Sequence, residues 1–336
     1  MKHLRKLLFP FAAIYYVVVF LRNTLYDNGV WQSTSYDFPL ICIGNLSTGG
    51  TGKTPMTEYV IRLLKDRTSV GVLSRGYGRK TSGFIAVTPE HSALEVGDEP
   101  LQYATKFMDV AIAVCEDRRA GIQKMRGEDM APSVIVLDDA YQHRKIKAGY
   151  AILLTSYDSL FSSDFVLPAG NLREARSGAK RAQAIIVTKC PANLSKKERE
   201  EIKAYLSKYA LETVYFTSIQ YDEMVCNERG TTSLSAISNK EITLVTGIAN
   251  PTPLLKHLHE KNLIFAHKKY GDHHNFTTTE ITALEKCACI LTTEKDYMRL
   301  KSLVKTPAIY YLPIQVSFLD DGKGSLDKAI LDFVNS

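Results

Sequence analysis

The stretch ICIGNLSTGGTGKTP, Ile41 to Pro55, constrains the fold of this chain more than any other part of its sequence. It starts in a short apolar run bounded by turn residues, which is typical of a buried strand, and then places four glycines in nine residues. The segment MTEYVIRLLK that follows carries apolar residues at helical spacing, with Pro55 at a plausible first helical position. A strand, a glycine-rich loop, a Lys-Thr pair and a helix in this order predict a phosphate-binding loop.

In such a loop, backbone N–H groups and the helix N-terminus receive the phosphates, Lys53 reaches the terminal ones and the Thr54 hydroxyl contacts Mg²⁺. The strict pattern requires a glycine five residues before Gly52, where this chain has Ser47. An ordinary glycine-rich turn with Lys53 as a surface charge is the alternative, and the order of strand, loop and helix favours the phosphate site. The residues expected to contact the nucleotide are Asn45, Ser47, Gly49, Gly50, Thr51, Gly52, Lys53 and Thr54.

The length and composition of the chain indicate a globular protein of more than one domain. Its 336 residues exceed one typical core, and an apolar fraction of 45% excludes wholesale disorder. The net charge of +6 suits an anionic substrate or a membrane surface, and without a basic tail we expect no nucleic-acid partner. The six cysteines are scattered, which indicates free thiols in a reducing compartment.

Short apolar runs recur along the chain and are separated by helical or loop segments. This pattern predicts a mostly parallel sheet with helices on both faces. The runs are Val70–Leu73, Val110–Val114, Val134–Leu137, Tyr150–Leu154 and Ala184–Val187. Lys196–Leu211 is predicted to be an amphipathic helix with a solvated charged face, and the polar segment Tyr221–Lys240 to connect two domains.

We therefore expect an α/β fold with three parts. Residues 1–30 would form an N-terminal membrane-associated helix, and residues 31–234 a P-loop core built on a mostly parallel sheet. Residues 235–336 would form a smaller C-terminal α/β domain, because EITLVTGIANPTPLLKHL restarts the order of strand, loop and helix.

The N-terminus combines the basic segment MKHLRK with 15 uncharged residues, Leu7–Leu21. As a helix this run covers roughly 22 Å, which is short for a bilayer core of about 30 Å. The following segment offers no small-x-small cleavage site, so we do not expect a signal peptide. The helix either inserts into one leaflet or packs on the protein. Tyr15, Tyr16, Tyr26 and Trp31 suit an interface, which favours membrane association.

Two acidic motifs supply candidate catalytic groups. In SVIVLDDAYQHR a buried strand ends in Asp138 and Asp139, where P-loop proteins hold Mg²⁺, although an acidic turn that caps a helix has the same pattern. In EVGDEP, Asp98 and Glu99 are either acids at a helix N-terminus or a carboxylate general base for an attacking hydroxyl. Spacing alone leaves these alternatives open.

Three further motifs place polar residues in loops. YGDHHNF contains Asp272, His273 and His274; adjacent histidines cannot both face one metal, so we expect no zinc site, and an Asp-His pair can instead tune the base across an interdomain cleft. LSRGYGRK and PAGNLREARSG carry Arg75 and Arg173 on glycine-containing loops, which suit a second anion such as a substrate phosphate. Each of these two could also be a solvated loop.

Together these motifs resemble one known family. GNLSTGGTGKTP, LSRGYGR, VGDEP, LDDAYQHR, PAGNLREA, YGDHHNF and LTTEKD occur in the order seen in tetraacyldisaccharide 4'-kinase, the lipid A 4'-kinase. The resemblance runs from the N-terminal apolar helix to near residue 300. The family's own loop is G-N-x-x-x-G-G-T-G-K-T, which accommodates Ser47, whereas TKCP at Thr188–Pro191 departs from the T-K-x-D form of base recognition.

The resemblance implies a kinase that transfers the γ-phosphoryl group of ATP to the 4'-hydroxyl of a tetraacylated glucosamine disaccharide 1-phosphate, giving lipid IV-A. ATP and Mg²⁺ are the implied cofactors. Lys53 and Thr54 would hold phosphates and Mg²⁺ with Asp138 or Asp139 as the metal partner, and Asp98 would be the base, paired with His273. Further implied site residues, for the substrate, are Arg75, Gln142, Arg173 and Glu174.

A glycolipid acceptor also implies a place in the cell. The acyl chains would stay in the bilayer while the head group enters the cleft, which puts the enzyme on the cytoplasmic face of the bacterial inner membrane. A membrane-attached P-loop NTPase switch is the alternative function, because it shares the loop, the strand-end acids and the N-terminal helix. A switch needs neither the GDEP motif, the Asp-His pair nor a second domain, so these features favour the kinase.

Overall fold

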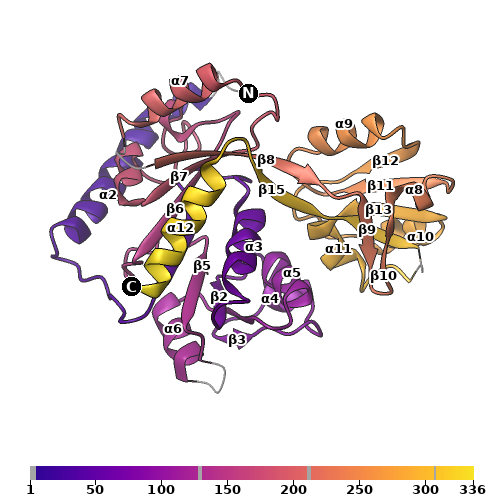
Figure 1. Ribbon diagram of the computed structural model, residues 1–336, viewed down its shortest axis with the longest axis horizontal. Helices are drawn as coiled ribbons and strands as arrows, with labels where there is room; N and C mark the ends of the chain where they lie inside the picture. The colour runs from indigo at the N-terminus through magenta and orange to yellow at the C-terminus, as the bar shows by residue number, and fades with distance from the viewer. Residues whose placement is uncertain (1–4, 128–130, 210–212, 306–307) are drawn as a thin grey trace.

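The computed structural model describes residues 5–127, 131–209, 213–305 and 308–336, which form two sheets (Figure 1). The larger sheet has the order β15-β8-β7-β6-β1-β5-β2-β4-β3. Its strands are β1 (Leu40–Asn45), β2 (Val70–Ser74), β3 (Ile85–Ala86), β4 (Ala111–Val114), β5 (Val134–Asp138), β6 (Tyr150–Ser156), β7 (Ala184–Thr188), β8 (Thr213–Tyr221) and β15 (Ile314–Phe318).

The strands of the larger sheet from β8 to β4 run parallel, and β3 and β15 are antiparallel at its two edges. Each of the five apolar runs in the sequence contributes one of its strands, and β1, β2, β5, β6 and β7 are buried along their whole length. Strands in a parallel sheet are covered on both faces, which is why they appear in the sequence as continuous apolar runs. The expected α/β class, with a mostly parallel sheet as its core, is confirmed.

The helices cover both faces of this sheet and connect its strands. They are η1 (Lys6–Leu8), α2 (Phe9–Asp27), α3 (Lys53–Leu64), α4 (Ala93–Val96), α5 (Asp98–Lys106), α6 (Arg118–Gly127), η2 (Phe161–Ser163), η3 (Arg176–Arg181), α7 (Lys196–Leu206) and α12 (Gly322–Asn335). Buried residues of the two sheet faces form separate apolar clusters, one of which contains Met56, Val60 and Ile61 of α3.

Two predicted helix boundaries were wrong. The helix α3 begins at Lys53, directly after Gly52 in the left-handed conformation, so Pro55 is its third residue rather than its first. Proline is tolerated there because the first N–H groups of a helix have no intrahelical partner. The helix α7 ends at Leu206 instead of Leu211, since the chain turns at Ser207 to Tyr209; Leu211 itself lies outside the described residues.

The smaller sheet has the order β10-β9-β14-β13-β11-β12, and β11 to β14 are parallel. Its strands and helices are β9 (Met224–Asn227), β10 (Gly230–Ser233), α8 (Leu234–Ile237), β11 (Ile242–Thr246), α9 (Thr252–Glu260), β12 (Phe265–Lys269), α10 (Thr278–Glu285), β13 (Cys289–Thr293), α11 (Glu294–Leu300) and β14 (Ile309–Leu312).

The segments that lead into and out of the smaller sheet differ from those predicted from the sequence. Tyr221–Lys240, expected to be a connection, instead contains the hairpin β9–β10 and the helix α8, because alternate side chains such as Val225 are buried in the apolar cluster of the smaller sheet. After β14 the chain returns to the larger sheet, where β15 pairs with β8 and Phe333 of α12 contacts Tyr150. These elements lie across the expected boundary at residue 235, and the division into domains stays a prediction.

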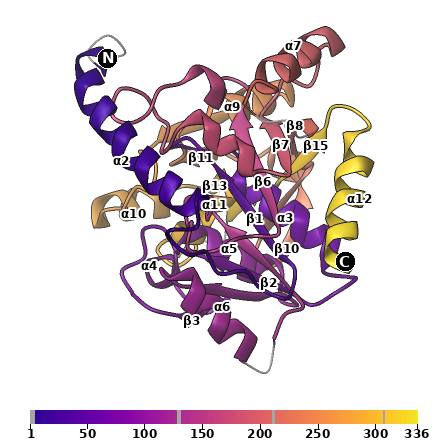
Figure 2. The ribbon, with the colours of Figure 1, turned by 90° about the vertical axis from the view of Figure 1, so that its left-hand side faces the viewer.

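The N-terminal helix α2 lies along one flank of the larger sheet, on the side away from the smaller sheet (Figures 1 and 2). Pro10 sits in its first turn and does not interrupt it. Within the described residues, this is the helix whose length and apolar composition would allow it to cross a membrane. Most of its apolar side chains are exposed: Phe9, Phe11, Ile14, Tyr16, Val17, Val18, Phe20 and Leu21.

Candidate active site

The carboxyl ends of the central parallel strands bring the predicted motifs to one edge of the larger sheet. Since β1, β5, β2 and β7 run parallel, the segments after Asn45, Asp138, Ser74 and Thr188 all leave at this edge. Open α/β sheets bind ligands outside the carboxyl ends of their strands. The polar motifs therefore meet where such a fold places its site.

The glycine loop between β1 and α3 is held by side chains at the ends of β1 and β7. Asn45 Nδ2 donates to Thr51 Oγ1 at 2.8 Å, and Thr188 Oγ1 donates to the Thr51 carbonyl at 2.8 Å. Lys189 Nζ donates to the Gly50 carbonyl at 2.5 Å. These contacts leave the loop anchored at the N-terminus of α3, as a phosphate cradle requires.

Glycine is needed at some loop positions and not at others. Gly49 and Gly52 have φ values of +102° and +82°, which few other residues adopt. Ser47 is not among the described residues with positive φ, and its backbone forms a bridge with Leu172. The missing first glycine of the strict motif therefore causes no strain here.

Asp139 faces two cations at the rim of this loop. Its carboxylate lies 3.7 Å from Lys53 Nζ and 2.9 Å from Arg173 Nη2. Burial disfavours the charged form of Asp139, but Lys53 and Arg173 outweigh it and keep the pKa of this carboxyl below its ordinary value. Asp139 is thus an ionised acid that orients the lysine of the loop.

Asp138 has the opposite environment. Its Oδ2 accepts a 3.3 Å hydrogen bond from Ser74, whereas its buried Oδ1 has no hydrogen-bond partner among the described residues. Burial, and secondly the charge of Asp139, raise the pKa of Asp138 to about 7. A buried carboxylate oxygen without a partner fits a hard cation such as Mg²⁺.

A network of side chains holds this edge together. Gln142 Nε2 donates to the Asn45 carbonyl at 2.8 Å and to Glu174 Oε1 at 2.9 Å. Arg173 donates to the side chain and the carbonyl of Asn45, and Arg181 pairs with Glu174 at 2.9 Å. Gln142, Arg173 and Glu174 therefore lie together beside the glycine loop.

The helix α2 is attached to the same network. Tyr15 Oη donates to the Arg173 carbonyl at 2.8 Å, and Asn23 Nδ2 donates to Glu174 Oε2 at 2.9 Å. Arg22 Nη2 donates to the Gln142 carbonyl at 2.5 Å. One side of α2 thus supports the site while its apolar residues face outward.

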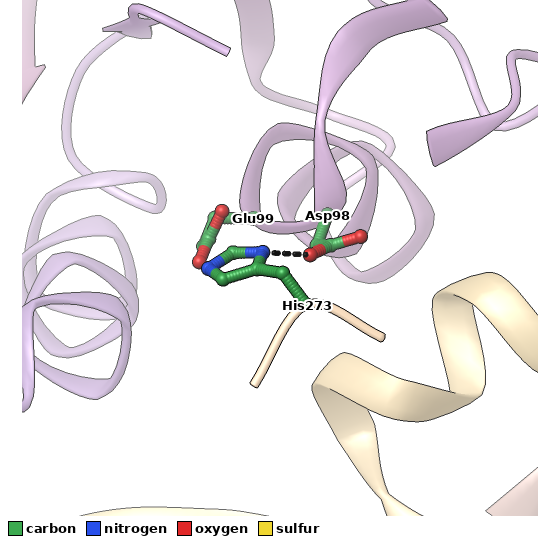
Figure 3. Close-up of side chains that lie close together, drawn as sticks. All are labelled: Asp98, Glu99 and His273. Atoms are coloured by element: carbon green, nitrogen blue, oxygen red, sulfur yellow. Dashed lines mark ion pairs between the residues drawn. The ribbon is translucent and has the colours of Figure 1, made fainter. Parts of the chain in front are cut away.

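A second cluster joins the two sheets (Figure 3). Asp98 starts α5, and His273 lies in the loop that follows β12 of the smaller sheet. His273 Nδ1 is 3.1 Å from Asp98 Oδ2, and Figure 3 shows Glu99 on the other side of the imidazole ring. The pair expected from the sequence is in contact, although its residues are far apart in the chain.

Two cations from α11 complete this cluster. Arg299 donates from Nε to Asp98 Oδ1 at 2.6 Å and from Nη2 to Oδ2 of the same carboxylate. Lys295 Nζ lies 3.0 Å from His273 Nε2 and 3.6 Å from Glu99. Burial disfavours ionisation of Asp98, but His273 and Arg299 outweigh it and lower its pKa.

Asp98, Glu99 and His273 have ligand atoms within 4.8 Å of one another, which is close enough for a metal ion. Lys295 and Arg299 already supply positive charge there, so we describe this cluster as an ion-pair network.

The two clusters border each other. The charge of Glu99 contributes to the raised pKa of Asp138. Gly97, before Asp98, packs against the backbone of Gly76 in the loop after β2, where an added Cβ would lie 3.1 Å away. The candidate base therefore stands beside the strand ends that carry the phosphate loop and the acids.

Other predicted residues have different surroundings. Arg75 is exposed at the end of β2. His274 pairs with Glu280 at 3.0 Å and is not part of the Asp98 cluster through its side chain. Asp272 lies 3.1 Å from Lys295 at the edge of that cluster.

Sequence reasoning missed Ser74, Lys189, Lys295 and Arg299. Lys295 belongs to the LTTEKD motif and Arg299 follows it four residues later, a spacing that would place both on one face of a helix, but no local pattern indicates that this face meets Asp98.

Comparisons with known proteins give a consistent result. The family model for tetraacyldisaccharide-1-P 4'-kinase matches residues 4–335. A tetraacyldisaccharide 4'-kinase of Flavobacterium johnsoniae is 45% identical over 340 residues, covering 99% of this chain and 98% of the relative. The one of Bacteroides thetaiotaomicron is 40% identical over 355 residues, covering 98% and 93%.

Among solved structures, LpxK from Aquifex aeolicus in complex with ATP superposes with a TM-score of 0.80 and 29% sequence identity. The match covers 98% of this chain and 99% of that one.

Proposed function

Because the chain belongs to the tetraacyldisaccharide-1-P 4'-kinase family, it is an ATP-dependent lipid A 4'-kinase, and we propose that the two clusters at the carboxyl edge of the larger sheet perform the transfer. The γ-phosphoryl group of ATP passes to the 4'-hydroxyl of a tetraacylated glucosamine disaccharide 1-phosphate. Family membership does not favour the alternative of a membrane-attached NTPase switch.

On the ATP side, backbone N–H groups of the glycine loop and the N-terminus of α3 bind the phosphates. Lys53 neutralises charge on the transferred phosphoryl group. Asp139 orients the Lys53 side chain, and Arg173 in turn binds Asp139. Thr54, Asp138 and Asp139 would hold Mg²⁺, and the ion would supply positive charge next to the phosphates. The unpartnered oxygen of Asp138 supports this assignment.

On the acceptor side, Asp98 takes the proton of the 4'-hydroxyl. As the O–H bond breaks, the hydroxyl oxygen forms a bond to the γ-phosphorus and the bond to the β-γ bridging oxygen breaks, releasing ADP. His273 holds the carboxylate from the side of the smaller sheet. The observation that carries this proposal is the contact of Asp98 with His273 beside the phosphate loop.

The candidate substrate residues divide into two groups. Gln142 and Arg173 bond to Asn45, Arg173 also pairs with Asp139, and Glu174 accepts a hydrogen bond from Gln142. These contacts support a role of all three in shaping the nucleotide side of the site. Arg75 is exposed beside the same edge, where a guanidinium group suits an anionic group of the acceptor.

We also propose that the enzyme is bound to the cytoplasmic face of the bacterial inner membrane. The exposed apolar side chains of α2 suit insertion into one leaflet. Arg5, which donates to Gly170 and Asn171, adds a positive charge shortly before the helix. Attachment there would leave the acyl chains of the acceptor in the bilayer while its head group reaches the site.

The proposal is tested by incubating the purified enzyme with γ-labelled ATP and vesicles that contain the acceptor. Label in lipid supports the kinase, and label only in free phosphate contradicts it. Asp98→Ala should lower kcat by on the order of 10²–10⁴ with a smaller effect on the KM for ATP.

His273→Ala should be non-additive with Asp98→Ala, because the two side chains act as a unit. A double variant whose losses simply multiply would argue against the pair, and near-normal turnover of a folded Asp98→Ala enzyme would exclude Asp98 as the base.

A further inference from the structure

Arg299 occupies the junction of the candidate base and its histidine. The guanidinium binds both oxygens of Asp98, and its Nη2 also lies 2.6 Å from His273 Nδ1. Its Nη1 donates to the His274 carbonyl at 3.2 Å, which ties the histidine loop to the same group. Asp98 is 2% exposed, so this contact is made inside the protein rather than on its surface.

We propose that Arg299 is a positioning residue for phosphoryl transfer, which orients the Asp98 carboxylate toward the acceptor and assembles the Asp98–His273 pair across the two sheets. The proposal rests on the role of Asp98 as the base. A planar guanidinium that binds a carboxylate through two hydrogen bonds fixes both the distance and the plane of that carboxylate. A lysine at this position would supply charge without that geometry.

The charges around Asp98 give Arg299 a role that its neighbours do not share. The groups facing the pair from the elements around it are Glu99 on α5, Asp272 on the β12–α10 loop, Lys295 and Arg299 on α11, and Tyr77 in the loop after β2, whose ring centroid lies 5.1 Å from that of His273. The Lys295 ammonium group contacts Glu99, Asp272 and His273. Arg299, in contrast, bonds to Asp98 itself. Without Arg299, the buried carboxylate would lose its direct counter-charge.

Loss of Arg299 therefore has a direction in pH. Burial of Asp98 would be opposed chiefly by His273, and the pKa of the carboxylate would rise. Because the ionised form accepts the proton, the acidic limb of the kcat profile would move to higher pH.

The same interface offers a matched control. Lys106 Nζ lies 2.8 Å from Glu58 and 2.6 Å from Glu294, so it also joins α11 to the larger sheet without touching Asp98 or His273. A variant at Lys106 weakens the contact between the sheets and leaves the candidate base intact.

The experiment compares Arg299→Gln, Arg299→Lys and Lys106→Gln in the full-length enzyme, with kcat, both KM values, pH profiles and melting temperatures. We expect Arg299→Gln to lose on the order of 10- to 100-fold in kcat, to shift the acidic limb upward and to leave the KM for ATP nearly unchanged. Arg299→Lys should keep the acidic limb of the kcat profile at its wild-type pH while losing part of kcat. If Arg299→Gln does not fold, Arg299→Lys is the variant that tests the proposal. Lys106→Gln should lower the melting temperature without moving the limb.

A folded Arg299→Gln enzyme with wild-type kcat and limb, or the same limb shift in Lys106→Gln, would overturn the proposal. An Arg299→Lys enzyme with unreduced kcat would overturn the part that requires two hydrogen bonds. Asp98→Asn distinguishes a failure of the base assignment from a failure of the role of Arg299. If Asp98→Asn is inactive while Arg299→Gln behaves as wild type, only the role of Arg299 fails. If Asp98→Asn remains active, the base assignment fails and the role of Arg299 with it.

Discussion

At the scale of single residues, Asp138 and Asp139 show how neighbours in sequence acquire different chemistry. Asp139 projects to the rim, with a φ of +47°, and meets Lys53 and Arg173, whereas Asp138 stays inside the strand end with a pKa raised to about 7. One acid is therefore a fixed negative charge that orients the loop lysine. The other, Asp138, has a buried oxygen without a hydrogen-bond partner among the described residues, and this oxygen is available to bind a cation.

Lys53→Ala tests the nucleotide side of the site. It should lower kcat by on the order of 10²–10³ or more, because it removes a charge directed at the transferred phosphoryl group. The fold should remain, since Arg173 still neutralises Asp139 at 2.9 Å. Steady-state transfer assays with a parallel thermal melt measure both effects, and Lys65→Ala, at the far end of α3, is the control. A folded Lys53→Ala enzyme with near-normal turnover would show that the phosphate-loop assignment is wrong.

At the scale of elements, α2 has one side bonded to the candidate site and another side of exposed apolar residues. Truncation through Arg22 should weaken vesicle binding and raise the KM for the lipid, but it also removes Tyr15 and Arg22, which bond to the carbonyls of Arg173 and Gln142 at the candidate site. Both substrates are therefore affected, and point variants are needed to separate the roles.

Val17→Asp, at a position that is 52% exposed, should reduce co-sedimentation with anionic vesicles by roughly tenfold or more, because a charge in the acyl region costs about 2.5 kcal/mol. Tyr15→Phe should leave sedimentation unchanged and lower kcat, since it removes the hydrogen bond to the Arg173 carbonyl. Unchanged sedimentation of Val17→Asp together with a lowered melting temperature would contradict the membrane role of this face.

The contact of α11 with α5 carries a pH-dependent stability. Burial, and secondly the charge of Glu58, raise the pKa of Glu294 to about 7, against about 4.3 for an unfolded glutamate. Between these values the folded protein holds a proton that the unfolded chain has released. The stabilising contribution of this group is therefore complete below about pH 4 and is lost as the pH rises through 7.

Glu294→Gln should make the free energy of unfolding fall less steeply as the pH rises, and should raise it at pH 8 by on the order of 1 kcal/mol. The reason is that a buried amide is neutral at any pH. Part of the wild-type slope should persist, since the raised pKa of Asp138 acts in the same direction. Urea titrations from pH 5 to 8 measure it, with the exposed Glu200→Gln as the control. Equal slopes in Glu294→Gln and wild type would show that Glu294 is ionised throughout.

At the scale of the whole molecule, the smaller sheet is an insertion between two paired strands. β8 ends at Tyr221, which pairs with Ile314 at the start of β15, and the Asp222 N–H donates to the Pro313 carbonyl at 3.0 Å. The two crossings of the chain thus lie side by side. After them, α12 buries Leu326 and Ile330 in the same apolar cluster as α3.

Replacing Glu223 through Leu312 by Asn-Gly should therefore leave a folded nucleotide-binding core, because an Asn-Gly turn can join β8 and β15 as a hairpin. This variant should gain melting temperature with ATP and fail to transfer phosphate, since it lacks His273 and Arg299. A chain cut after Leu234 is the comparison: it loses β15 and α12 and should aggregate. Cooperative folding of the cut chain with failure of the excised one would contradict this topology.

The sequence alone determined the central strands of the larger sheet and their order along the chain. Apolar runs predicted the buried strands, and the glycines before Lys53 predicted the phosphate loop, because burial and positive φ impose requirements on a few adjacent residues. The paired acids at the end of β5 could be identified for the same reason. That the YGDHHNF loop could tune the base was open from its residue types, but the pairing of His273 with Asp98 came from the resemblance to a family, since no local pattern specifies it.

Only the tertiary structure decided which distant segments meet. Arg299 is 201 positions from Asp98, Tyr15 is 158 positions from Arg173, and β15 returns past the whole smaller sheet to pair with β8. Such contacts depend on how helices and sheets pack against one another, which periodicity and spacing along the chain do not encode. The residues that position the site were therefore found in the fold, while those that bind phosphate could be recognised in the sequence.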